Sequence, residues 1–156
     1  MKALGTERLY DVDFYRWTRR VAELLRERRF DEIDLEHVAE EIADMGKRDR
    51  RELRSRMIIL LMHLLEWQLQ PKLRDGSTWL ATIVEQRRQI WLVLEDSPSL
   101  HGMLEDELPL LYMRAARATL KETGLPDNLP SECPYTVSQV LDDDFIPEGR
   151  RLGRKR

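Results

Sequence analysis

The chain has 156 residues, of which 42% are hydrophobic and 35% charged; this length and composition predict one soluble globular domain. The single cysteine, Cys133, excludes an internal disulfide, and the start of the chain lacks the apolar segment of a signal peptide, so we expect a cytoplasmic protein. The longest apolar run, residues 57–65, already contains His63 and falls well short of the ~20 residues of a membrane span, which excludes a transmembrane protein.

The charge is distributed unevenly along the chain. The net charge is −3, yet residues 150–156 carry five positive charges, so the remainder is distinctly acidic. We therefore divide the chain into a single helical domain, residues 1–148, and a basic tail, residues 149–156. An acidic body is a poor surface for nucleic acid, so contact with nucleic acid is expected only through the tail, which is otherwise simply solvated.

Helices are predicted for the first half of the chain. Glycine and proline are sparse before position 70, and no Asn-Gly or Asp-Gly turn joins two alternating apolar runs, so strands have little support. Asp13 is placed to cap a first helix, residues 13–28, and Asp34 to cap a second. The positions expected to face the core are Phe14, Trp17, Val21, Leu24 and Leu25 in the first helix and Leu35, Val38, Ala39, Ile42 and Met45 in the second.

Gly46 leaves two alternatives open for the second helix. Glycine is a common residue at a helix end, and the helix then stops there. The apolar spacing nevertheless continues in phase, at Leu53, Met57, Leu60, Leu64 and Trp67. This continuity indicates instead one long central helix that ends before Pro71.

Two more helices and an irregular strap are predicted for the second half. Ser77 opens a helix, and residues 96–98 begin another, which Pro109 interrupts or kinks and Gly124 ends. The inward positions of the first of these are Leu80, Ile83, Val84, Ile90, Trp91 and Leu94. The rest is proline-rich, with a short helix after Thr136, and its apolar residues predict a strap laid on the bundle: Leu129, Tyr135, Val140, Leu141 and Phe145. The fold class is therefore all-α, a helical bundle with a long central helix and an irregular proline-rich C-terminal strap.

Three polar residues in and beside the apolar segment are the candidates for chemistry. Asp49, Arg56 and His63 recur every seven positions, which places them along one edge of the apolar stripe. Because residues 57–65 are otherwise apolar on every side, His63 is expected to be buried. One interpretation is a structural network, in which His63 bonds to a carbonyl or carboxylate and Arg56 bridges helices. The other is an active site, in which Arg56 clamps a phosphate and His63 is the general acid or base.

The second interpretation has a counterpart in a known pattern. The spacing R-x6-H on one helix resembles the loose motif of HEPN-type helical ribonucleases, in which a dimer assembles the site. That resemblance implies metal-independent cleavage of RNA centred on Arg56 and His63, with Asp49 in line.

A metal site is suggested by the repeated spacing of HVAE, residues 37–40, and HLLE, residues 63–66. Ferritin-like sites use the reverse order, Glu-x-x-His, from facing helices at one level of a bundle. In one continuous helix His37 and His63 lie about 39 Å apart, and in a chain folded back at Gly46 they miss each other by about two turns. We therefore expect neither a metal nor a cofactor. We also expect Glu66, which is turned away from the line of Asp49, Arg56 and His63, to face solvent.

The charges on either side of Gly46 suggest association. Residues 31–44 are acidic and residues 47–56 are basic, so the blocks attract each other across a folded-back hairpin or between two antiparallel copies. Glu52 and Arg56 are also spaced for a pair within one helix. The arginines have no interleaved aromatic side chains to stack on bases, so a solvated or dimer-contact face is expected, and a homodimer with it.

Five separated motifs resemble, in order, a bacterial family catalogued as domain of unknown function twenty-nine. They are LYDVDFYRWT, FDEIDLEHVAEEIADMGKRDRRELRSRM, LLMHLLEWQLQP, EDSPSL and ETGLPDNLPSECPYTVSQVLDDDFIPE, and the resemblance covers roughly residues 9–148. It implies a cytoplasmic, helical, single-domain protein with no established activity. It also implies that asparagine often stands at the place of His37 and lysine at that of Glu66, which weakens the metal hypothesis, whereas His63 and Trp67 fit the pattern.

These observations favour a non-enzymatic protein-interaction module, which we expect to form a homodimer and to bind an unknown protein partner. The alternative from another class is the metal-independent ribonuclease with Arg56 and His63.

Overall fold

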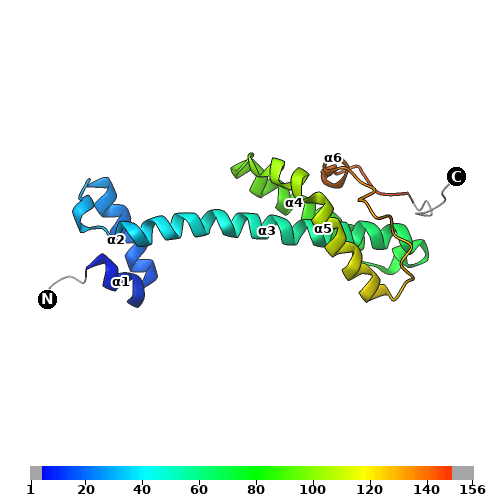
Figure 1. Ribbon diagram of the computed structural model, residues 1–156, viewed down its shortest axis with the longest axis horizontal. Coiled ribbons are helices and arrows are strands. Elements are labelled where there is room, and N and C mark those ends of the chain that lie inside the picture. The colour runs from blue at the N-terminus through cyan, green and yellow to red at the C-terminus, as the bar shows by residue number, and fades with distance from the viewer. Residues whose placement is uncertain (1–4, 149–156) are drawn as a thin grey trace. The chain divides into compact units, whose positions relative to one another are not determined.

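The computed structural model describes residues 5–148, which are helical without any strand (Figure 1). The predicted basic tail, 149–156, lies outside the described residues. The α-helices are α1 (Thr6–Val12), α2 (Phe14–Arg26), α3 (Leu35–Leu69), α4 (Trp79–Asp96), α5 (Leu100–Thr123) and α6 (Val137–Leu141), with short 3-10 helices η1 (Phe30–Glu32) and η2 (Pro71–Gly76). The all-α prediction with a long central helix is confirmed. Helix α1 was not predicted.

Four helix ends follow the capping residues that the sequence indicated, whereas α4 and α5 begin after Thr78 and Ser99 rather than at the predicted Ser77 and residues 96–98. The Asp13 carboxylate accepts a hydrogen bond from the backbone N–H of Arg16 at 3.0 Å, and Asp34 accepts one from His37 at 3.4 Å. Gly124 ends α5 with a φ of 66°, a left-handed conformation that glycine adopts without strain. Thr136 begins α6 with a reciprocal capping box.

Helix α3 is continuous through Gly46, which decides between the two alternatives for this glycine. A glycine inside a helix costs about 1 kcal/mol relative to alanine, which a helix of this length tolerates. Pro109 likewise lies inside α5 without ending it, so of the two alternatives the interruption is wrong and the kink stays a prediction.

Two compact units make up the chain, an N-terminal unit that ends at Arg48 and a C-terminal unit that begins at Asp49. The single domain over residues 1–148 stays a prediction. In the N-terminal unit, α1, α2 and η1 pack on the first turns of α3 around a small core: Leu9, Trp17, Val21, Leu24 and Ile33, with Tyr10 and Val38 against it.

The C-terminal unit holds the larger core. The second part of α3 lies alongside α4 and α5, and the segment after α5 returns over them (Figure 1). Between residues 57 and 66, α3 buries side chains on nearly every side, as its all-round apolar sequence predicted. The strap residues Tyr135, Val140 and Leu141 are buried in the same core, and Leu129 and Phe145 pack on it, so the predicted strap is confirmed.

Several residues predicted to face the core are instead exposed. They are Phe14, Leu25, Leu35, Ile42, Met45, Leu80, Val84 and Trp91. Periodicity gives the angular position of a side chain on its helix, but it does not say whether a second element lies opposite. No helix among residues 5–148 is long and apolar enough to cross a membrane.

Candidate functional site

The three candidate residues Asp49, Arg56 and His63 all lie on α3, but they do not form one cluster. Arg56 donates from Nε to Glu52 Oε1 at 2.8 Å, the pair that the spacing predicted, and from Nη1 to Gln86 Oε1 of α4 at 3.4 Å. Arg56 therefore bridges two helices, as the structural-network interpretation expected. Asp49 is half-exposed, and within the described chain no hydrogen bond or ion pair joins it to Arg56.

His63 is held by a carboxylate of its own helix. Its Nδ1 lies 2.5 Å from Glu66 Oε2, and the side chains are 21% and 3% exposed, respectively. The prediction that Glu66 faces solvent is wrong, because the packing that surrounds residues 57–65 extends to this turn. A buried carboxylate on Nδ1 fixes the orientation of the imidazole and directs its other nitrogen, Nε2, away from the pair. His63 is half-buried rather than fully buried.

Carboxylates dominate the surroundings of the Arg56 guanidinium. Besides Glu52, the Arg56 charge acts on Glu85, whose pKa is lowered to about 2 by hydrogen bonds from Arg88 and Gln89 and by the positive charges of Arg88 and Arg56. A phosphate approaching Arg56 would meet these negative charges. The guanidinium is thus placed for bridging α3 and α4 rather than for clamping a phosphate.

His37, the other histidine of the HxxE repeat, belongs to an aromatic cluster in the N-terminal unit. The ring of Tyr10 stacks on it with centroids 3.9 Å apart, and its Nδ1 is paired with Asp34. The Tyr10 hydroxyl donates to Glu41 Oε1 at 2.7 Å, which, with burial, raises the pKa of Tyr10 to about 12. These contacts join α1 to α3. Over residues 5–148, no group of three or more His, Cys, Asp and Glu side chains is arranged to hold a metal ion.

Arg87 is the buried polar residue that sequence reasoning missed. Its side chain is fully buried, and it donates to three strap carbonyls: Val140 O at 2.8 Å, Asp143 O at 3.5 Å and Phe145 O at 2.6 Å. Burial lowers its pKa, although the nearby Asp143 and Asp142 oppose this. Its position between Ile83, Ile90 and Leu94 on the inward face of α4 was the available signal. An arginine at such a position needs hydrogen-bond acceptors from another segment.

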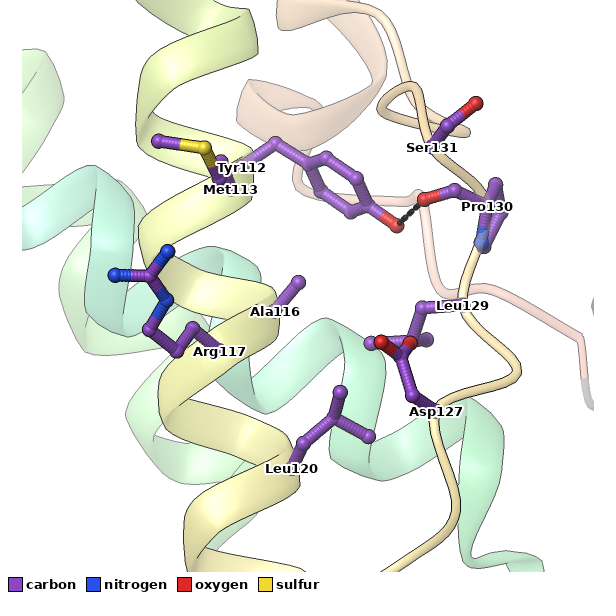
Figure 2. Close-up of a pocket in the computed structure, with 9 residues that line it drawn as sticks. All are labelled: Tyr112, Met113, Ala116, Arg117, Leu120, Asp127, Leu129, Pro130 and Ser131. Atoms are coloured by element: carbon purple, nitrogen blue, oxygen red, sulfur yellow. Dashed lines mark hydrogen bonds between the residues drawn. The ribbon is translucent and has the colours of Figure 1, made fainter.

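A cleft lies between α5 and the strap in the C-terminal unit (Figure 2). Its volume is about 520 Å³, and Ala116, Leu120 and Leu129 contribute apolar walls. The Tyr112 hydroxyl is not free for a ligand, because it donates to Pro130 O at 2.8 Å and burial raises its pKa to about 12. Figure 2 shows the Arg117 guanidinium directed away from the strap. Asp127 and Ser131 also line the cleft, on the side of the strap.

The most exposed apolar surface of α3 lies in the N-terminal unit. Leu35, Ile42 and Met45 are 57%, 64% and 61% exposed, and we call these three residues the open face. At 100° per residue they continue the stripe that is fully buried at Leu53 and Leu60 further along the same helix. The small residues Ala39, Ala43 and Gly46 lie beside them and are also exposed. A partner can thus approach this helix closely.

Exposed charges lie on the same segment of α3 as the open face. Lys47 and Arg48 pair with acidic residues of their own helix, Asp44 at 3.3 Å and Glu41 at 3.8 Å, and the two cations are largely exposed. Such pairs contribute little to stability in water. These side chains are therefore free to exchange partners when another surface arrives.

A model of one protein family matches residues 9–146. The chain belongs to the family described as Domain of unknown function DUF29. This confirms the resemblance drawn from the five motifs. No curated protein and no solved structure matches the chain. Membership therefore brings no activity with it, and the function has to be inferred from the geometry above.

Proposed function

We propose that this DUF29 chain is a non-enzymatic protein-interaction domain, which acts as a homodimer in the cytoplasm of a bacterium. One observation carries the proposal: the open face exposes three large apolar side chains along one line of α3. Single exposed apolar residues are ordinary, but an aligned group on one helix is typical of a surface that another chain covers.

The helix provides the two properties that such a surface needs. Its backbone is already helical, because α3 runs without a break from Leu35 to Leu69, so binding requires little ordering of the backbone. It also carries exposed charges of both signs, which give specificity more than affinity. The single cysteine and the family resemblance support the cytoplasmic and bacterial parts of the proposal.

The test is a substitution in the middle of the open face. Ile42→Asp adds a charge where a partner must pack, and Val84→Asp, at a similarly exposed position on α4, is the matched control. We expect the Ile42→Asp chain to lose partners that the wild-type and Val84→Asp chains retain from a lysate of the native host, with each partner then titrated in purified form. Equal binding by all three chains would contradict the proposal.

A second candidate function rests on the His63 and Glu66 pair. A half-buried imidazole oriented by a buried carboxylate is also the arrangement of a general base, and it favours the ribonuclease with Arg56 and His63. The test compares RNA cleavage by the wild type, His63→Ala and Arg56→Ala. Equal rates for the three chains would eliminate this candidate.

A further inference from the structure

We propose that the open face of α3 binds the same face of a second copy, with the two helices antiparallel about a two-fold axis level with residue 44. This inference rests on the proposed function, because it names the occupant of the surface on which that function depends. Three features carry it: the charge order along α3, the angular positions of the charges, and the space at Gly46.

The charge order along α3 changes sign near the middle of the exposed segment. Glu36, Glu40 and Glu41 precede Gly46, and Lys47, Arg48 and Arg50 follow it. In a parallel pair in register, each block would meet its own copy, and like charges would lie together. Only the antiparallel arrangement brings the acidic block of one copy against the basic block of the other.

The positions of individual charges fix the register. An antiparallel pair matches each flank of a helix with the same flank of its copy. On one flank lie Glu36 and, further along, Arg50; on the other lie Glu41 and Arg48. The midpoints of the pairs 36 with 50 and 41 with 48 both fall within one residue of position 44. One axis therefore satisfies two opposite-charge pairs, each of which occurs twice in the dimer.

The same axis brings apolar groups together at the centre. Ile42 of one copy lies level with Gly46 of the other, since their midpoint is also position 44. Nothing lies within 4 Å of the place where a side chain would begin at Gly46, so this glycine leaves room for the Ile42 side chain. Glycine on a helix surface allows such a close approach. Ile42, which is 64% exposed in the single chain, becomes covered.

The charges are available for this exchange of partners. Arg48 reaches Glu41 of its own helix only at 3.8 Å, and Arg50 reaches Glu107 at 3.5 Å with half of its side chain exposed. These exposed pairs hold their cations weakly. Pairing across the dimer replaces them without breaking a buried contact.

Light scattering of the full chain tests whether a second copy is the occupant. We expect a mass near twice 18.6 kDa that falls toward the single-chain mass on dilution, and an Ile42→Asp chain that stays at the single-chain mass. A wild type that remains a single chain at all concentrations would overturn this inference and the homodimer, but not the binding of another protein at the open face, which the lysate experiment tests. A dimer that Ile42→Asp does not affect would also overturn this inference, because the dimer would then use another surface.

Cysteine cross-linking tests the antiparallel register. In a Cys133→Ser chain, which is free of cysteine, Met45→Cys places a thiol on the open face one residue from the axis, and we expect a rapid disulfide between copies. Leu35→Cys is the matched control, because nine residues from the axis its two copies lie roughly 27 Å apart and should not link. Rapid linkage through Leu35→Cys would indicate parallel helices and overturn the proposed register.

A charge exchange tests the pairing itself. Glu36→Arg and Arg50→Glu should each weaken the dimer about tenfold or more, because like charges then face each other twice. The chain that carries both changes should dimerise like the wild type. A double variant that is as weak as either single variant would show that these residues do not pair across the dimer.

Discussion

The two ends of α3 carry the same apolar stripe, which is buried at one end and exposed at the other. In the C-terminal unit, Leu53, Met57, Leu60 and Leu64 are fully buried under α4, α5 and the strap. In the N-terminal unit, the open face of the same stripe is more than half exposed. The residues are chemically alike, so the difference comes from what packs against them. A stripe on a helix is thus only half of an interface, and its other half is supplied either by the same chain or by another.

The largest effect is expected from a matched pair of side-chain truncations on the stripe. Leu60→Ala should lower the free energy of unfolding by about 3–5 kcal/mol, because it removes buried contacts and leaves a cavity. Ile42→Ala, in dilute protein where association contributes least, should change it by no more than about 0.5 kcal/mol. Chemical denaturation measures both. Similar losses at the two positions would mean that Ile42 is already covered within the single chain.

The next test removes Arg87, whose hydrogen bonds fasten the strap to α4 in the C-terminal unit. Arg87→Met keeps the apolar stem but takes the hydrogen bonds from three strap carbonyls, and we expect a loss of about 3 kcal/mol. Arg88→Met, its exposed neighbour on α4, is the control and should cost less than about 1 kcal/mol.

Cys133 reports whether the strap itself has loosened in these two variants. It packs on the C-terminal core, and burial raises the pKa of its thiol, so the wild type should react slowly with a thiol reagent. The Arg87→Met chain should react about tenfold faster or more, because opening of the strap becomes easier. Loss of stability with unchanged Cys133 reactivity would show that Arg87 stabilises the unit without fastening this part of the strap.

The contrast also explains which parts of the molecule could be predicted from the sequence. Caps are local, so Asp13, Asp34, Gly124 and Thr136 were found where a side chain or a left-handed glycine meets the nearest backbone. The all-helical fold and the strap follow from periodicity and proline content. Whether the helix continues through Gly46 depends on the neighbouring turns as well, because one glycine costs less free energy than the rest of a long helix contributes.

Burial depends on distant segments, and there the sequence was a weaker guide. Glu66 lies on the side of α3 opposite the main stripe and was expected in solvent, yet it is buried beside His63. Arg87 was missed because its partners are strap carbonyls more than fifty residues away in the chain. The candidate trio was located correctly on one helix, but only the structure shows Arg56 engaged by Glu52 and Gln86.

A smaller effect is expected at Gly46, near the point where the stripe changes from exposed to buried. Gly46→Ala should stabilise the surrounding turns of α3 by about 1 kcal/mol, because alanine is the better helix former and the added methyl group meets no other atom. Hydrogen exchange of the amides around position 46, in dilute protein, should slow about fivefold. Faster exchange would mean that this surface is covered within the single chain. If the slowing disappears at high concentration, the methyl group is obstructing a second copy.

The smallest expected effect concerns an ion pair that joins α3 to α5 inside the C-terminal unit. Arg54 donates to both carboxylate oxygens of Glu107, each at 2.6 Å, and this bonding holds the pKa of Glu107 below its ordinary value. A carboxyl group with a lowered pKa in the folded state stabilises the fold above its unfolded pKa, about 4.3, and the contribution is lost as the pH falls below that value.

Glu107→Gln should therefore be less stable than the wild type at pH 7, by less than about 1 kcal/mol because the pair is partly solvated. The difference should shrink as the pH falls below about 4.3. Glu105→Gln, at an exposed position on the same helix, should keep the pH dependence of the wild type. Denaturation midpoints at a series of pH values measure all three chains. A difference for Glu107→Gln that stays constant with pH would show that the lost stability comes from packing. The covered end of α3 would then depend on apolar burial alone, and its contrast with the open face would be one of contact area, without a contribution from charge.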